Sequence, residues 1–292
     1  MKRILNIGSL NIDHVYRVPQ FVRPGQTLVS ASYSRGPGGK GLNQSIAAAR
    51  AGAAVAHAGC IGDDGRFLLD LLTQAGADTA RVAITQTPTG HAIIQTDAHG
   101  ENCIVLYPGA NHEVRAEHAQ AFFDQFGDGD LLLLQNEITD VGRLIELGKA
   151  RGMTVLFNPA PMTQAVGAYP LAMVDIAVLN ESEAAELSGV DDPPAGLESL
   201  RRRLPGAEII VTLGARGCAY RGEQEAFDLP AVKVEPVDTT AAGDTFVGYL
   251  AAGIAAGISR REALQRATRA AALTVQRPGA ANAIPHANEL TR

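Results

Sequence analysis

Short apolar runs alternate with segments of helical spacing along most of the chain. The apolar runs predict buried strands, several of them apolar on both faces, at Ile4–Gly8, Ala54–Ile61, Leu131–Gln135, Thr154–Phe157, Asp175–Leu179 and Glu208–Leu213. The intervening and following segments predict helices at Gly41–Ala51, Arg66–Ala75, Ala116–Gln125, Val141–Arg151, Ser182–Leu187, Leu197–Arg203, Ala242–Ala256 and Arg260–Gln276. This alternation predicts an α/β fold, with a mainly parallel central sheet covered by helices on both faces.

Two stretches depart from this pattern, His14–Arg35 and His91–Tyr107. They alternate polar and apolar residues, and their expected strand positions are Val15, Val18, Val29, Ile93, Thr96, Ile104 and Leu106. Asp97-Ala98-His99-Gly100 supplies a hairpin turn. We expect the stretches to pair into one small sheet outside the main domain, although two separate surface hairpins fit the pattern equally well. The chain has no Pro/Ser-rich linker, which favours a single domain over residues 1–292.

Composition narrows the functional classes. The 292 residues include 31 acidic and 25 basic side chains, for a net charge of −6, which argues against a general binder of nucleic acid or membrane surfaces. The longest apolar run, Phe246–Ile258, falls well short of the roughly 20 residues that a bilayer requires. Cys60, Cys103 and Cys218 lie far apart without zinc-ligand spacing, so we expect a protein of the reducing cytoplasm.

The strongest local signal is the segment Asp238–Phe246, a loop of small residues that runs directly into a predicted helix. Small residues allow a ligand to approach the backbone, and amides at a helix N-terminus bind anions. Asp244 alone would fit a helix cap, but two acids framed by Thr-Thr and Gly are less easily explained that way. Phosphoryl transfer needs a carboxylate near the attacking hydroxyl and amides near the phosphate, and this segment offers both.

A glycine-rich segment gives a second signal. Gly36, Gly38 and Gly41 match G-x-G-x-x-G, and Asp63 lies 22 residues after Gly41, as in dinucleotide-binding folds. That fingerprint normally follows the first core strand, which here leads into Gly8-Ser9-Leu10-Asn11 instead. The match therefore gives weak support to a dinucleotide-dependent oxidoreductase.

Other polar motifs follow predicted strands, where ligands bind in open α/β sheets. Asn11 and Asp13 come at the end of the first strand, and such a pair can hold adjacent sugar hydroxyls or form an Asx turn. Glu137 is placed to accept another hydroxyl. The segment Asn180–Glu183 fits either a helix cap or a water-mediated Mg²⁺ site, and Thr212–Gly217 fits either a nucleotide loop or a plain turn. Their shared position predicts one site.

The chain resembles the ribokinase family of carbohydrate kinases over nearly its whole length. Gly38–Gln44 resembles the N-terminal signature of that family, and Asp238–Phe246 its C-terminal signature. Lys40, Asn43-Gln44 and Pro108–Asn111 resemble the ribokinase branch rather than the fructokinase and adenosine kinase branches. The resemblance implies a three-layer α/β fold with a small β-sheet lid, inserted at roughly 12–36 and 91–107, which often forms a homodimer contact. It also implies transfer of the γ-phosphoryl group of ATP to the 5-hydroxyl of ribose, with Mg²⁺ and usually K⁺.

The resemblance also implies roles for individual residues. Sugar binding would involve Asn11, Asp13, Gly39, Lys40, Asn43, Glu137 and Asp244. Asp244 would be the catalytic base, with the amides of Ala242 and Gly243 as the anion hole. Nucleotide, phosphates and Mg²⁺ would involve Asn180, Glu183, Thr212, Gly214, Gly217, Gly243 and Thr268. The monovalent cation would be held at Asp238, Thr240, Thr274, Arg277, Gly279 and Ala283.

Departures from the family pattern and three alternatives remain open at this point. Ala283 stands where Ser is common, Pro278 precedes Gly279, and Thr268 stands where Asn often borders the adenine. The alternatives are a kinase for another small sugar, fructose-type, or for a nucleoside; a non-catalytic sugar or nucleotide sensor; and the oxidoreductase. The intact Gly243-Asp244 pair argues against a sensor, because a sensor needs no base.

Overall fold

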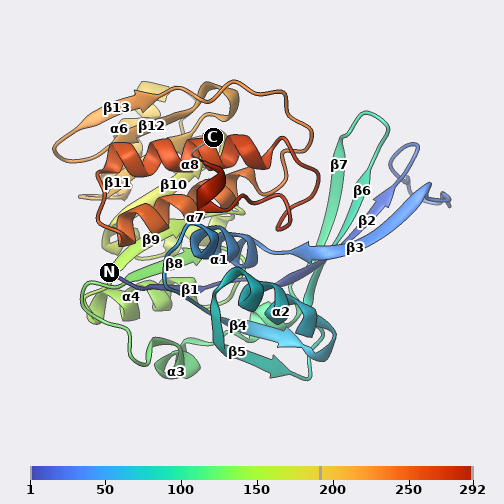
Figure 1. Cartoon of the computed structure of the whole chain (residues 1–292), viewed down its shortest axis with the longest axis horizontal. Coiled ribbons are helices and arrows are strands. Elements are labelled where there is room, and N and C mark those ends of the chain that lie inside the picture. The colour runs from blue at the N-terminus through green and yellow to red at the C-terminus, as the bar shows by residue number, and fades with distance from the viewer. Residues whose placement is uncertain (1, 191–192, 291–292) are drawn as a thin grey trace.

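Parallel strands form the centre of the molecule. The computed structural model describes residues 2–190 and 193–290, and within them a sheet runs in the order β13-β12-β11-β10-β9-β8-β1-β4-β5 (Figure 1). The parallel strands are β1 (Ile4–Ile7), β4 (Val55–Gly62), β5 (Asp78–Thr85), β8 (Leu131–Gln135), β9 (Thr154–Asn158), β10 (Ile176–Asn180) and β11 (Glu208–Thr212). At one edge, β12 (Cys218–Arg221) and β13 (Ala226–Leu229) are antiparallel.

Helices cover both faces of this sheet. One face packs against α1 (Lys40–Arg50), α2 (Arg66–Ala75), α7 (Ala242–Ala255) and α8 (Arg260–Thr274). The other packs against α3 (Ala119–Phe123), α4 (Val141–Ala150), α5 (Glu181–Ser188) and α6 (Pro193–Arg203). In β8, Leu131 and Leu133 enter the first core while Leu132 and Leu134 enter the second, which explains its uninterrupted apolar run. The predicted α/β fold with a mainly parallel sheet is confirmed.

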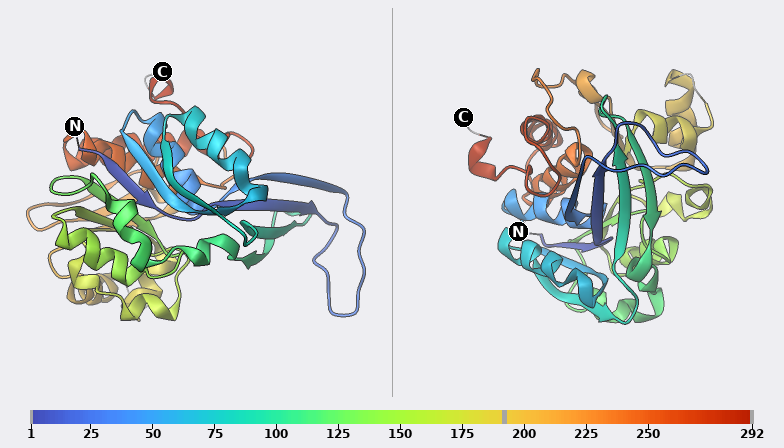
Figure 2. Two further views of the ribbon diagram at one scale, coloured as in Figure 1. Left: turned by 90° about the horizontal axis from the view of Figure 1, so that it is seen from below. Right: turned by 90° about the vertical axis from the view of Figure 1, so that its right-hand side faces the viewer.

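The two inserted stretches form one small sheet, as expected. Its order is β3 (Ser32–Gly38), β2 (Asn11–Arg17), β6 (Gly90–Thr96) and β7 (Asn102–Tyr107), with β2 and β6 parallel. This sheet projects from one end of the main domain, and the loop between β2 and β3 extends furthest (Figures 1 and 2). The alternative of two separate hairpins is wrong, because β2 and β6 pair directly across the two stretches. The predicted turn at Asp97–Gly100 joins β6 to β7.

Some expected elements differ from the structure. Val18 and Val29 lie outside the strands, because β2 ends at Arg17 and β3 begins at Ser32. The helix expected at Ala116–Gln125 is a 3₁₀ turn followed by the short α3, and Gln125 has a positive φ of 67° that no helix continues. The edge strands β5 and β13 and the neighbouring β12 were not predicted; β5 begins Asp-Thr-Ala-Arg and offers no apolar run. Short 3₁₀ helices occur at Asp63–Gly65, Gly109–Glu113, Ala116–His118, Gln164–Ala168, Leu171–Met173, Gly214–Arg216 and Ala287–Glu289.

Among residues 2–190 and 193–290, no helix combines the length and the apolar character needed to cross a bilayer.

Candidate active site

The predicted polar motifs meet at one edge of the sheet. The parallel strands β8, β9, β10 and β11 end side by side, so the residues that end or follow them share this edge. A polar pocket of about 230 Å³ there is lined by residues from several elements, among them Lys40, Asn158, Asn180, Glu183, Thr212, Thr239, Gly243 and Asp244. Motifs that are far apart in the sequence therefore contribute to one cavity. Not every predicted residue lines it: Asp13 lines a neighbouring pocket, and Asn11 and Glu137 line neither.

Asp244 lies in the first turn of α7, and its carboxylate is 9% exposed. Oδ2 accepts a hydrogen bond from Asn43 Nδ2 at 3.0 Å, and Oδ1 accepts one from Gln44 Nε2 at 3.0 Å. The simple cap interpretation is wrong, because the helix begins after Ala241, with φ 60°, and Asp244 binds side chains of α1 instead. A Cβ built on Gly243 would meet no described atom within 4 Å, so the helix N-terminus opens into the pocket. This geometry suits an anion.

Charged groups of both signs surround this carboxylate. Lys40 begins α1, and its pKa is raised chiefly by Asp244, with help from Glu137 and Glu183. The Glu137 carboxylate accepts hydrogen bonds from the Lys40 amide at 3.0 Å and from the Ser9 hydroxyl. Burial raises the pKa of Glu137, although Lys40 opposes this effect. One ammonium group therefore lies among several carboxylates.

Asp13 has the clearest electrostatic signature of the site. Burial, followed by repulsion from Glu137 and Asp244, raises its pKa from 3.8 to about 6. Its carboxylate lies against Gly38, where a built Cβ would stand 2.1 Å from Oδ1. The three acids of this cluster come from β2, from the loop after β8 and from α7. Such closely spaced acids are typical of functional sites.

Asn11 and Asp13 lie inside β2, in the small sheet, and not at the end of the first strand, because β1 ends at Ile7. This placement contradicts the Asx-turn alternative. Asn11 Oδ1 accepts a hydrogen bond from Asn111 Nδ2 at 2.7 Å, and Asn111 Oδ1 accepts one from the Leu10 amide at 2.9 Å. Because its oxygen is occupied in this way, Asn11 is left with its amide group as a donor. The orienting role of Asn111 was not predicted, although its motif was noted.

The glycine-rich segment serves close packing at this site. Gly36 and Gly38 lie in β3 of the small sheet, and α1 begins at Lys40, so the segment does not follow a core strand as a dinucleotide fingerprint would. Gly39 has φ 96°, and a Cβ there would stand 2.9 Å from the Asn11 nitrogen. Glycine is therefore required to bring the start of α1 against β2.

Asn180 and Glu183 form a capping box at the start of α5. Asn180 Oδ1 accepts a hydrogen bond from the Glu183 amide at 2.8 Å, and the Glu183 carboxylate accepts one from the Asn180 amide at 2.9 Å. The cap interpretation is thus confirmed, and the same two residues line the polar pocket. Burial raises the pKa of Glu183, as expected for a carboxylate that faces other acids.

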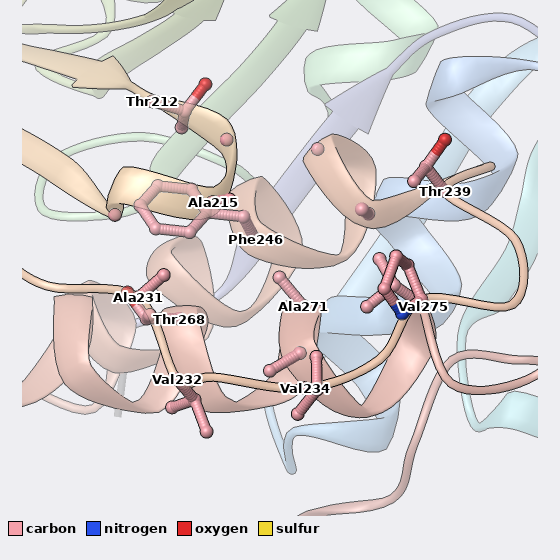
Figure 3. A pocket seen from close by; sticks show the side chains of 16 residues that line it. Thr212, Ala215, Ala231, Val232, Val234, Thr239, Phe246, Thr268, Ala271 and Val275 are labelled. Carbon is pink, nitrogen blue, oxygen red and sulfur yellow. The ribbon is translucent and has the colours of Figure 1, made fainter.

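An apolar cavity of about 320 Å³ adjoins the polar pocket, and the two share Thr212, Thr239 and Gly243. Figure 3 shows it between the loop after β11, the segment 231–239 and helices α7 and α8. Thr268 lines it but donates its hydroxyl hydrogen to the Leu264 carbonyl at 2.8 Å. The predicted nucleotide residues Gly214 and Gly217 also line this cavity, so the loop after β11 is more than a plain turn. A flat, largely apolar group fits here.

Of the six residues that the resemblance assigns to a monovalent cation, Asp238, Thr240 and Gly279 form one hydrogen-bonded group, and Thr274, Arg277 and Ala283 lie outside it. Asp238 accepts from the Thr240 amide and hydroxyl at 2.9 and 2.6 Å and from the Gly279 amide at 2.9 Å. Burial raises the pKa of Asp238, but these hydrogen bonds outweigh it and the pKa is lowered. Thr274 is buried and bonds Thr245 and the Ala270 carbonyl, while the Arg277 guanidinium binds Glu289. Ala283 is 1% exposed and offers no side-chain oxygen. Backbone carbonyls would therefore have to supply much of any ligand set.

The chain belongs to the pfkB family of carbohydrate kinases, whose description matches residues 1–287. It is therefore an enzyme that transfers a phosphoryl group to a carbohydrate. A ribokinase of Haemophilus influenzae is 37% identical over 99% of this chain and 97% of its own. The ribokinase of Cryptococcus neoformans var. grubii serotype A, solved with ADP, has TM-score 0.90 and 33% identity over 99% and 98% of the two chains. The Arabidopsis thaliana ribokinase, solved with ribose and ATP, has TM-score 0.89 and 26% identity over 100% and 98%.

Proposed function

We propose that the enzyme transfers the γ-phosphoryl group of ATP to the 5-hydroxyl of D-ribose, giving ribose 5-phosphate and ADP. The observation that carries this proposal is the position of Asp244, between a polar cluster suited to a sugar and the N-terminus of α7, which opens toward an apolar cavity. The full-length similarity to ribokinases supports ribose as the acceptor.

The sugar binds among residues of β2, the start of α1 and the loop after β8. Asp13 and Glu137 accept hydrogen bonds from hydroxyls, and Asn11 and Lys40 donate to sugar oxygens. Asn43 shares its amide between Asp244 and the sugar, and Gly39 provides close backbone approach. A cluster of acceptors and donors within one polar site suits a polyhydroxyl ligand better than an apolar or a purely anionic one.

ATP binds across the two adjoining cavities. Its base enters the apolar cavity beside Ala215, Thr268 and Ala271, and its phosphates reach the polar pocket at Asn180, Glu183 and Gly243. The Glu183 carboxylate, hydrogen-bonded on one oxygen, would hold a phosphate-bound Mg²⁺ through water. When bound, the metal neutralises charge on the phosphate oxygens.

In the chemical step, Asp244 takes the proton from the 5-hydroxyl as the oxygen attacks the γ-phosphorus. A new O–P bond forms, the bond to the β,γ-bridging oxygen breaks, and ADP leaves with that electron pair. The amide of Gly243, in the first turn of α7, would stabilise the charge that develops on the transferred group. The amide of Ala242 would do the same once it gives up its hydrogen bond to the Thr239 carbonyl at 3.3 Å.

The small sheet acts in this proposal as a lid over the sugar, within a single kinase domain that spans the chain. β2 carries both Asn11 and Asp13, so movement of this sheet would close the sugar site and exclude water. Ile104 and Val105 of β7 are exposed and would suit contact with a second lid in a homodimer. We also propose that the enzyme is cytoplasmic. K⁺ activates it by binding at the loops around Asp238 and Gly279.

A coupled assay of ADP release with ribose, run with and without K⁺, tests the function. We expect turnover with ribose to exceed that with fructose or a nucleoside. A preference for one of these would assign the enzyme to another sugar or nucleoside, and absence of ADP release with every acceptor would revive the sensor. Tight nicotinamide dinucleotide binding without ATP binding would favour the oxidoreductase.

A further inference from the structure

A chain of buried amide side chains leads away from Asp244 into the core. Gln44, on α1, donates from Nε2 to Asp244 Oδ1 and to Asn158 Oδ1, both at 3.0 Å. Its own oxygen accepts a hydrogen bond from Gln135 Nε2 at 2.7 Å, and Gln135 Nε2 also donates to Asn6 Oδ1 at 3.0 Å. These side chains are between 0% and 9% exposed, so water does not compete for their hydrogen bonds.

Backbone carbonyls at both ends fix the direction of every amide in this chain. Asn6 Nδ2 donates to the Gly41 carbonyl at 2.9 Å, and a carbonyl can only accept, so the Asn6 oxygen must face Gln135. At the other end, Asn158 Nδ2 donates to the Val178 carbonyl at 2.9 Å, so the Asn158 oxygen must face Gln44.

The amides between these two ends can satisfy both constraints in only one orientation. Gln135 must present its NH₂ group to Asn6 and Gln44, and Gln44 must then present its NH₂ group to Asp244. The reversed orientation of Gln44 would bring its oxygen against the oxygens of Asp244 and Asn158 and leave the Gln135 donor facing another donor.

We propose that Gln44 is a positioning residue for the catalytic carboxylate, and that Gln135 and Asn6 act through it by locking its amide in the donating orientation. This inference rests on the proposed role of Asp244 as the base. A donor fixed on Oδ1 holds the plane of the carboxylate relative to the sugar hydroxyl, and a hydrogen bond to a charged group is stronger than one between neutral groups.

One polar atom of this chain of amides has no hydrogen-bond partner within the described structure. Among the described residues, Gln135 Oε1 is buried and has no hydrogen-bond partner, so Gln135 uses its NH₂ group twice and its oxygen not at all. Few buried polar atoms lack a partner in folded proteins, so the orientation of Gln135 is set by its two acceptors and not by its own oxygen. A Cβ on Gly8 would stand 2.3 Å from that oxygen, so glycine makes room for the side chain.

Other charged groups also act on Asp244, and the test must separate them from the amides. They are Lys40 of α1, Asp13 of β2, Glu137 after β8 and Glu183 of α5. None of them hydrogen-bonds Gln135 or Asn6 in the described part of the chain. Substitution of Gln135 therefore perturbs Asp244 through Gln44 while these charges remain.

The decisive variant is Gln135→Met, which keeps the length of the side chain and removes the hydrogen-bond donor to the Gln44 oxygen. We expect kcat to fall by up to about ten-fold near neutral pH, because Gln44 then lacks the donor on its oxygen and holds the Asp244 carboxylate less firmly, and complete loss of one hydrogen bond to a charged group is worth roughly that factor. We also expect KM for sugar and for ATP to change little, because, within residues 2–190 and 193–290, the side-chain amide of Gln135 hydrogen-bonds only Gln44 and Asn6. Gln44→Met should show at least the same loss.

Ser45→Ala is the matched control. Ser45 is equally buried and accepts from Asn6 Nδ2 at 2.8 Å, but without it Asn6 still donates to the Gly41 carbonyl and keeps its orientation. We expect Ser45→Ala to reduce the free energy of unfolding while kcat and KM stay as in wild type.

A double-mutant cycle completes the test. If Gln135 acts through Gln44, Gln135→Met will have little further effect on kcat in the Gln44→Met background. Unchanged kcat in folded Gln135→Met, a rise in KM in place of a fall in kcat, additive losses in the cycle, or an equal fall of kcat in Ser45→Ala would overturn the proposal. The wild-type rate is measured in the same assay. If wild type phosphorylates ribose and Gln135→Met has the same kcat, only the proposed role of the amides is refuted. If wild type shows no turnover, the proposed function is refuted as well.

Discussion

Replacement of Asp13 by asparagine should stabilise the free enzyme while it weakens sugar binding. Burial and the neighbouring Glu137 and Asp244 carboxylates raise the pKa of Asp13 from 3.8 to about 6. The folded protein therefore disfavours the ionised form that a sugar hydroxyl would need as acceptor. Asparagine has nearly the same shape and no charge, so it removes the electrostatic cost and the charged acceptor together.

The sign and size of the stability effect follow from the two pKa values. Below pH 4 the side chain is protonated in both folded and unfolded states, and wild type carries no penalty. Between pH 4 and 6 the unfolded chain ionises first, so the penalty grows, and above pH 6 it is constant. The difference between 3.8 and about 6 corresponds to at most roughly 3 kcal/mol, or a rise in Tm of about 5 °C for a chain of this length.

Thermal unfolding of Asp13→Asn and wild type without ligand, at pH 5 and pH 8, measures this effect. We expect the variant to be the more stable at pH 8 and its advantage to shrink at pH 5. Calorimetry should show sugar affinity reduced by about 10- to 100-fold with ATP affinity nearly unchanged. Asp70→Asn, an exposed carboxylate on α2, is the control and should show neither effect. An advantage that is absent or independent of pH, or equal losses of sugar and ATP affinity, would refute the reasoning.

Three further predictions concern the same site. In wild type, KM for the sugar should rise as pH falls below about 6, because Asp13 becomes protonated; a KM that is flat between pH 5 and 8 would contradict this. Ala271→Phe should fill the apolar cavity and raise KM for ATP at least about ten-fold with sugar affinity kept, and equal effects on both ligands would argue against a nucleotide there. Replacement of K⁺ by a large organic cation should lower kcat, and Asp238→Ala should abolish the dependence on K⁺; a rate independent of the cation would remove that site from the account.

The sequence predicted the core of the fold because both faces of the central sheet are covered. Strands such as β8 are apolar throughout, and their positions and sheet class could be predicted without coordinates. The edge strand β5 could not, because none of its residues is fully buried and most of them are polar or small. The prediction that the two inserted stretches form one sheet is confirmed, although the sequence pattern alone did not distinguish one sheet from two hairpins.

The candidate site was predicted in part. Residues that follow parallel strands converge for a topological reason, and this identified Glu137 after β8 as a candidate. Asp13 was predicted on the same ground although it lies inside β2, and Asp244 was predicted from the loop of small residues that leads into α7. The hydrogen bond from Gln44 to Asp244 could not be predicted from the sequence. The two residues are 200 positions apart and meet only because α1 packs against α7. The one available signal was a polar residue at the end of an otherwise apolar run, as with Gln135 in β8.

The central claim is that the Asp244 carboxylate removes the proton of the attacking hydroxyl. The most direct test is single-turnover phosphorylation of ribose by Asp244→Asn, with folding checked by circular dichroism and ATP binding by calorimetry. The account predicts at least about a 10²-fold loss of the phosphorylation rate in a protein that folds and still binds ATP. A rate close to that of wild type would contradict it.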